Sequence, residues 1–156
     1  MLKENWLFLC FEMMCNYFPH SYTVREDKRR FLDLAEHFYA LESRIENHLS
    51  TEIKVFFYRT IGRGYSENGM NEEVLPYYKN AVKLLSEQDN GNLLLEDIIK
   101  THFAISECYM NLDDYDNAIM YADIVIDYLT NDKFYENGYY GYLFIAYLRR
   151  AKCKDL

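Results

Sequence analysis

Two arginines lie four residues apart near the middle of the chain, at Arg59 and Arg63. A planar guanidinium can hold a carboxylate through two parallel hydrogen bonds, so this pair suits a ligand that carries a carboxylate or acidic side chains. On a helix the four-residue spacing places both side chains on one face. The alternative is that each arginine pairs with an acidic neighbour on a solvated face, which requires no ligand.

The other reactive side chains lack the spacing of a catalytic or metal site. The segment 62–64 contains two glycines but follows no strand and lacks the third glycine of a phosphate-binding loop. The aspartates in 113–116 lack the glycine and closing glutamate of a calcium loop, and Cys108 has no histidine close in sequence. The four histidines are scattered, at His20, His37, His48 and His102. The sequence therefore predicts a non-enzymatic protein without metal or cofactor.

The elements that position the arginines are expected to be helices. The chain has 156 residues, half of them hydrophobic, with 16 Tyr and 10 Phe but only 2 Pro and 6 Gly. Few turn residues in this length mean few turns and therefore long elements, which favours helices over many short strands. We expect one all-α domain over residues 1–156.

Charge and cysteine use exclude several classes of partner. The net charge of −8 opposes contact with a phosphate backbone, and the basic runs are short. No stretch reaches the roughly 18 apolar residues of a membrane span. The four cysteines form no C-x-x-C pair, which is typical of reduced thiols in the cytoplasm. We expect a cytoplasmic protein that contacts neither nucleic acid nor membrane.

Caps and changes of period predict about seven helices. Thr23 and Glu26 have capping-box spacing, Asn68-Gly69 is a helix stop, and Asp114 is a natural N-cap. Pro76 predicts a kink or a late start of its helix. The expected helices cover about 3–17, a long segment after 23–26, 51–67, 71–86, 93–111, 115–129 and 133–156.

Two stretches align without a gap at an offset of 44 residues. The first reads Tyr58-x2-Ile61-Gly62-x2-Tyr65, then Gly69, Val74-x3-Tyr78 and Ala81; the second reads His102-x2-Ile105-Ser106-x2-Tyr109, then Asp113, Ala118-x3-Ala122 and Val125. This pattern resembles the tetratricopeptide (TPR) repeat, W-x2-L-G-x2-Y followed by A-x3-F. The resemblance implies a right-handed superhelical stack of antiparallel helix pairs.

The spacing also sets the expected organisation of the domain. The offset exceeds the usual 34 residues of the family, and the surplus falls in 84–93. A partial third match is Asn137-x2-Tyr140-Gly141-x2-Phe144. We expect a divergent helix pair over 1–50, repeats over 51–87 and 93–130, and a terminal helix over 133–156.

Long helix pairs, many tyrosines and acidic charge resemble the peptide-sensing repeat domains of pheromone-responsive regulators from Gram-positive bacteria. That resemblance implies a quorum-sensing transcriptional regulator whose sensing part binds a short peptide or protein segment and forms a homodimer. No helix-turn-helix is evident in this chain, so it would be the sensing part or a standalone relative.

In a stack of helix pairs the first helix of each pair lines the concave side. Guanidinium groups there can bind carboxylates, an asparagine can hold a peptide backbone, and aromatic rings can accept apolar side chains. The candidate peptide-binding residues are Arg59, Arg63, Phe103, Glu107, Asn111 and Tyr142.

The alternative function is a structural scaffold or oligomerisation module. The last expected helix is rich in aromatic side chains, and no second helix follows to cover them. Large uncovered apolar faces usually mark interfaces. The candidate interface residues are Tyr135, Tyr139 and Leu143.

Overall fold

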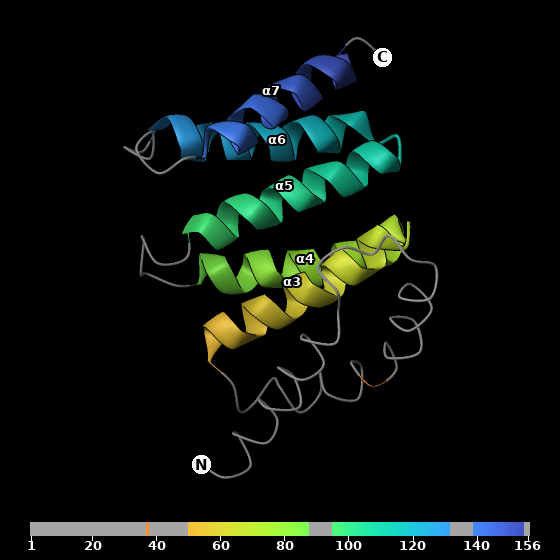
Figure 1. Cartoon of the computed structure of the whole chain (residues 1–156), viewed down its shortest axis with the longest axis vertical. Helices are drawn as coiled ribbons and strands as arrows, with labels where there is room; N and C mark the ends of the chain where they lie inside the picture. Colours follow the sequence, from red (N-terminus) through yellow and green to blue (C-terminus); the bar gives the residue numbers. More distant parts are fainter. Residues whose placement is uncertain (1–36, 38–49, 88–94, 132–138, 155–156) are drawn as a thin grey trace.

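The computed structural model describes residue 37 and residues 50–87, 95–131 and 139–154, and within these residues the fold is all-helical without strands. The described helices, five in all, carry their labels in Figure 1. Their bounds are α3 (Thr51–Glu67), α4 (Asn71–Ser86), α5 (Leu95–Asn111), α6 (Tyr115–Asn131) and α7 (Tyr140–Lys154). The helix pair expected over 1–50 lies outside the described residues apart from His37 and Ser50.

The helices stack in chain order, each running opposite to the one before it (Figure 1). Every helix packs against the next along the chain, and smaller contacts join α3 to α5 and α5 to α7. The odd-numbered helices therefore meet one another across the stack, which brings together side chains that are far apart in sequence.

The turns after α3 and α5 have the same hydrogen-bonding geometry. Gly69 follows α3 with φ 77°, and Asp113, its equivalent 44 residues on, follows α5 with φ 59°. In each turn the residue after the one with positive φ donates its amide to a tyrosine carbonyl of the preceding helix. Met70 donates to Tyr65 at 3.0 Å, and Asp114 donates to Tyr109 at 3.0 Å. Such bonds satisfy carbonyls that the helix end leaves free. The repeat seen in the sequence is thus a repeat of local structure.

Local signals also fix where the helices start. Asp114 caps α6 as expected, because its carboxylate accepts a hydrogen bond from the amide of Asn117 at 3.2 Å. Pro76 lies inside α4, which nevertheless begins at Asn71, so the late start does not occur. The first two acidic residues of α4, Glu72 and Glu73, favour this start because they lie at the positive end of the helix dipole.

The core has two clusters of buried apolar side chains. The first joins α3 and α4 to the inner side of α5, where Ile105 and Cys108 have no exposed surface. The second joins α5, α6 and α7 through Ile99, Val125 and Ala146. Helix α5 contributes to both clusters and is the central element of the described stack.

Small side chains occur where paired helices cross closely. A Cβ atom built on Gly62 would lie 2.5 Å from Cε1 of Tyr78 in α4, so that position has no room for a side chain. At the equivalent position of α5, the hydroxyl of Ser106 donates to the carbonyl of Ala118 in α6 at 2.8 Å. In each helix pair, the two helices thus come closest at one small residue of the first helix.

The last described helix is α7. Tyr139 lies in a turn and α7 starts at Tyr140. The first part of the helix expected from about Lys133 stays a prediction. The segment 132–138 lies outside the described residues. None of the helices in the described part of the chain is long and apolar enough to cross a membrane.

Candidate binding surface on α3, α5 and α7

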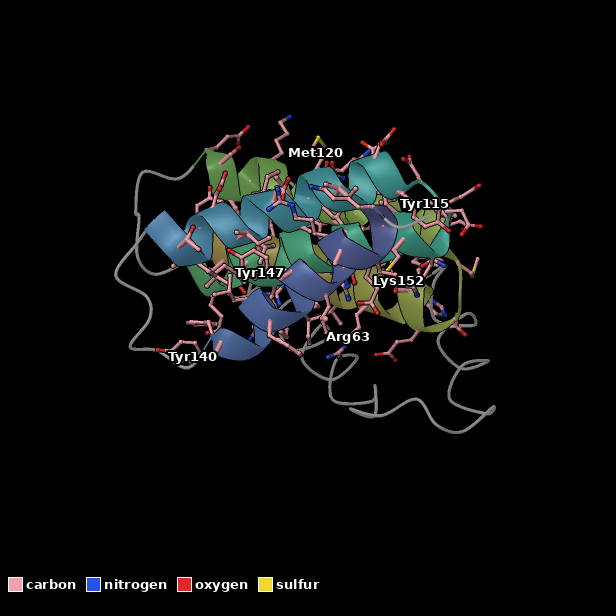
Figure 2. All side chains as sticks on the ribbon, turned by 90° about the horizontal axis from the view of Figure 1, so that it is seen from above. Arg63, Tyr115, Met120, Tyr140, Tyr147 and Lys152 are labelled. Atoms are coloured by element: carbon pink, nitrogen blue, oxygen red, sulfur yellow. The ribbon has the colours of Figure 1, made fainter. Side chains whose placement is uncertain are left out.

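The candidate peptide-binding residues of α3, α5 and α7, with the exception of Asn111, lie on one side of the stack. Viewed along the stack in Figure 2, Arg63 of α3 and Met120 of α6 point to opposite sides. Arg63 and Tyr142 both lie close enough to Arg59 to affect its pKa, and Phe103 contacts Tyr142. We call Arg59, Arg63, Phe103, Glu107 and Tyr142 the α3–α5–α7 surface.

Arg59 is already paired in this structure. Its guanidinium forms an ion pair with Asp97 of α5, and the two side chains are 23% and 34% exposed. Burial lowers the pKa of Arg59 from its ordinary value, and the neighbouring Tyr78, Tyr142 and Glu96 oppose that shift. The pair joins the first helices of two successive helix pairs, so Arg59 has a structural partner as well as a place on the surface.

Arg63 is the more available guanidinium. Its side chain is 46% exposed, and its contact with Glu67 in the same helix has an N–O distance of 3.9 Å. At that separation and exposure an ion pair contributes little to stability. Arg63 can therefore bind an incoming carboxylate while giving up only a weak contact.

The aromatic part of the surface is formed by Phe103 and Tyr142. Their rings meet edge to face with centroids 5.1 Å apart, an arrangement favoured by the charge distribution of aromatic rings. Both side chains are half-buried. They form a partly exposed apolar patch between α5 and α7.

A buried arginine of α7 supports this patch from behind. Arg149 is 9% exposed and its guanidinium lies 3.8 Å from the centroid of Phe103. It donates to the carbonyl of Phe103 at 2.7 Å and pairs with Glu107 at 3.0 Å. Burial lowers the pKa of Arg149, and the carboxylate of Glu107 opposes that shift.

Sequence reasoning missed Arg149, although a signal was present. Four residues of α7 recur at helical spacing, and three of them are buried while the first is half-buried. These are Tyr142, Ala146, Arg149 and Cys153. The spacing places Arg149 on the same side of the helix as Tyr142, facing α5.

Asn111 lies apart from the other candidates. It is exposed at the end of α5, and its amide donates to the side-chain oxygen of Asn71 at 3.4 Å. Asn71 begins α4, so Asn111 belongs to the end of the stack where the short turns lie. Its role in binding remains a prediction.

The candidate interface residues of the last helix face inward where they are described. Tyr139 and Leu143 pack against the second core cluster. Tyr139 also lies close enough to Glu96 of α5 for each side chain to shift the pKa of the other. Tyr135 lies outside the described residues. The exposed side chains of α7 are instead Tyr140, Phe144, Ile145, Tyr147 and Leu148.

The described thiols are buried, and the described acidic side chains form no metal site. Cys108 and Cys153 are buried and not bridged. Burial raises the pKa of Cys108 to about 11, which keeps the thiol protonated at neutral pH. Within the described residues, no group of three or more His, Cys, Asp or Glu side chains could hold a metal ion.

No protein family, curated protein or solved structure was found to match this chain. The surface combines one available guanidinium, a partly exposed aromatic pair and a carboxylate, Glu107, that is 48% exposed. Such a surface can bind charged and apolar groups of one ligand together, which is how proteins recognise peptides.

Proposed function

We propose that this protein is a non-catalytic peptide-binding module, built as a TPR-like right-handed superhelical stack of helix pairs. It binds a short linear peptide or protein segment on the α3–α5–α7 surface. The observation that carries the proposal is the half-exposed guanidinium of Arg63 on the side of the stack that also carries the aromatic pair Phe103 and Tyr142.

The two signs of charge on the surface favour a peptide over a simple anion. Arg63 supplies positive charge, whereas Glu107 remains 48% exposed although it pairs with Arg149. A peptide presents a carboxylate, amide groups and apolar side chains along one short chain, and so matches all three kinds of group. Phosphate-rich ligands would meet repulsion from the net charge of −8.

The proposal also includes a cellular location and a regulatory role for the module. Buried, unbridged thiols at Cys108 and Cys153 support a reducing cytoplasmic location. The repeat and the acidic, tyrosine-rich composition support a role as the sensing part of a bacterial peptide-responsive transcriptional regulator. In such a protein, ligand binding shifts the equilibrium between two arrangements of the stack.

A phage-displayed library of random short peptides tests this function even though the natural ligand is unidentified. Peptides selected on the full chain are measured by calorimetry against the wild type and against Arg63→Ala. Loss of a charged hydrogen bond should weaken binding about tenfold or more. The melting temperature should hardly change, because the contact with Glu67 is long and the Arg63 side chain is 46% exposed.

A matched control is available on the other side of α7. Arg150 pairs with Asp123 of α6 and is 38% exposed, which resembles Arg63 in exposure. Arg150→Ala should leave peptide affinity unchanged. Equal losses for both variants would indicate a general charge effect, and the proposal would then fail.

A second candidate function rests on a different observation. Phe144 is 64% exposed and Leu148 is 52% exposed on the outer side of α7, which no other described helix covers. This favours a scaffold or oligomerisation module, with a homodimer as its simplest form. The two functions use different sides of the stack and can coexist in one protein.

A further inference from the structure

Arg63 and Glu107 occupy equivalent positions in successive helix pairs. They are 44 residues apart, which is the offset between the two repeats, and each lies on the first helix of its pair, α3 or α5. Their side chains are 46% and 48% exposed. Both lie close enough to Tyr78 of α4 to affect its pKa, so they belong to one neighbourhood. Adjacent helices of the surface therefore present opposite charges at the same position of the repeat.

The ion pair of Glu107 has its cation inside and its anion outside. The side chain of Arg149 is 10% exposed, and its guanidinium also contacts the ring and the carbonyl of Phe103. Oε2 of Glu107 lies 3.0 Å from this guanidinium, yet the Glu107 side chain remains 48% exposed. A ligand on the surface thus reaches the carboxylate first. Because Coulomb interactions weaken with distance, Glu107 acts toward that ligand as a negative group.

The spacing of the two charges matches one conformation of a peptide. Helices that pack together have axes about 8–10 Å apart, and the ion pair of Arg59 with Asp97 joins α3 directly to α5. A polyproline II segment has three residues per turn and rises about 3.1 Å per residue, so residues i and i+3 point the same way about 9 Å apart. In an extended strand these two residues point to opposite faces. A polyproline II segment that crosses α3 and α5 can therefore contact both charges.

The aromatic pair lies next to Glu107, between α5 and α7. Phe103 is four residues before Glu107 on α5, which places the two side chains on one face of that helix. The ring of Phe103 meets that of Tyr142 in α7. Aromatic surfaces bind polyproline II segments well, because such a segment is already ordered before it binds. An apolar side chain of the ligand has its place here.

We propose that the ligand of the α3–α5–α7 surface is a polyproline II peptide with an acidic and a basic residue three positions apart and an apolar residue beyond the basic one. The acidic side chain pairs with Arg63 and the basic one with Glu107. The apolar side chain packs on Phe103 and Tyr142. This inference rests on the proposed peptide-binding function and names the class of peptide that is bound.

Peptides with a single sign of charge fit this surface less well. An all-acidic peptide meets Glu107 and the net charge of −8 of the whole chain. An all-basic peptide meets Arg63. Placing like charges against each other is a general means of rejecting wrong partners. The surface therefore selects for the order of charges along the ligand as well as for their presence.

The first test uses only the wild-type chain. Three phage-displayed libraries each fix one glutamate and one lysine, in both orders, with one, two or three random residues between them. Calorimetry then compares the best binders of each library. Peptides with two intervening residues should bind about fivefold more tightly than the others, because only their spacing allows both exposed ion pairs to form.

A second test combines variants of the protein with variants of the selected peptide. Glu107→Gln is measured with the peptide and with a form in which glutamine replaces the lysine. Arg63→Gln is measured in the same way against replacement of the peptide glutamate. Each double-mutant cycle should show a coupling of about fivefold in affinity. The crossed combination of Arg63→Gln with the lysine replacement should show none.

A matched control is available on the same helix. Glu96 is also on α5, is 52% exposed and pairs with a basic residue, Lys100. Glu96→Gln should show no coupling to the peptide lysine. The glutamine of Glu107→Gln can still accept a hydrogen bond from Arg149, and thermal unfolding checks that this variant is folded.

The results separate this inference from the proposed function. Tighter binding at a spacing of one or three residues, or a peptide lysine that couples to Glu96 instead of Glu107, overturns the inference. The peptide-binding function still holds in that case if Arg63→Ala weakens binding. Failure of all three libraries to yield a binder contradicts the function itself, and the inference fails with it.

Discussion

The guanidinium of Arg149 lies 3.8 Å from the centroid of the Phe103 ring and donates a hydrogen bond to the carbonyl of that same residue at 2.7 Å. A cation over a ring and a charged hydrogen bond are each stronger when water is excluded, and Arg149 is buried. Glu107 balances its charge from the exposed side. Arg149 thereby fixes α7 on α5 and sets the position of the aromatic pair.

Replacing Arg149 should therefore be costly. Arg149→Ala removes the ring contact, the bond to Phe103 and the ion pair with Glu107, and should lower the free energy of unfolding by about 2–4 kcal/mol. Arg150→Ala, which loses only a half-exposed pair with Asp123, should cost about 0–1 kcal/mol. Urea unfolding measures both, and similar values for the two variants would contradict this role of Arg149.

Two glycines at equivalent positions should respond oppositely to the same change. Gly62→Ala forces a Cβ atom against Tyr78 and should destabilise the fold by about 1–3 kcal/mol. Gly141→Ala adds its methyl group in open space on a helix and should stabilise by about 0.5–1 kcal/mol. Thermal unfolding distinguishes the two. A double variant with Tyr78→Leu should recover part of the Gly62→Ala loss if the clash is the cause.

His102 should make stability depend on pH. Its ring lies among Tyr121 and Tyr128 and its Nδ1 is 2.8 Å from the carbonyl of Ile98, to which it donates as the neutral tautomer. Burial lowers the pKa of His102 below the ordinary value of about 6.5. On acidification the unfolded chain binds the proton first, so the stabilising contribution is complete above about pH 6.5 and is lost as pH falls below it.

The variant His102→Gln isolates this effect, because the other histidines are unchanged. The stability difference between the wild type and the variant should shrink as pH falls from about 7.5 to about 5. Urea unfolding at a series of pH values measures it. A difference that stays constant over this range would show that His102 does not bind a proton more readily in the unfolded chain.

Cys108 should be unreactive while the protein is folded. It has no exposed surface and burial raises its pKa to about 11, so little thiolate is present near pH 8. Alkylation by iodoacetamide, followed by mass spectrometry of the peptide that contains Cys108, should be slow in buffer and fast in urea. Rapid alkylation of the folded protein would mean that this thiol is accessible and activated.

The sequence predicted the helix boundaries well where the signals are local. The third and fourth helices were expected over 51–67 and 71–86, and the structure has them at Thr51–Glu67 and Asn71–Ser86. The turn between these two helices requires a positive φ, which Gly69 adopts. A glycine at a helix end is a signal that can be recognised from the adjacent sequence alone. The N-cap at Asp114 is also a local signal, because its partner Asn117 is only three residues further along the chain.

The site could be predicted only in part, because it depends on the rotation of α7. Arg149 and Phe103 are 46 residues apart, and the helical spacing of Arg149 with Tyr142 and Ala146 does not by itself show which side of α7 faces α5. Aromatic residues occur all around α7, so composition alone does not distinguish the buried Leu143 side from the exposed Phe144 side. Which residues of α7 face outward is decided by how this helix packs on α5 and α6.

The central claim is that a peptide binds the α3–α5–α7 surface, and the arginine side chains report on it directly. In an NMR titration with a library-selected peptide, the Nε–Hε signals of Arg59 and Arg63 should shift while that of Arg150 stays in place. Each signal is assigned from the corresponding single variant. If Arg59 and Arg63 do not move while the peptide binds, or if Arg150 moves instead, the ligand occupies another surface and the account is wrong.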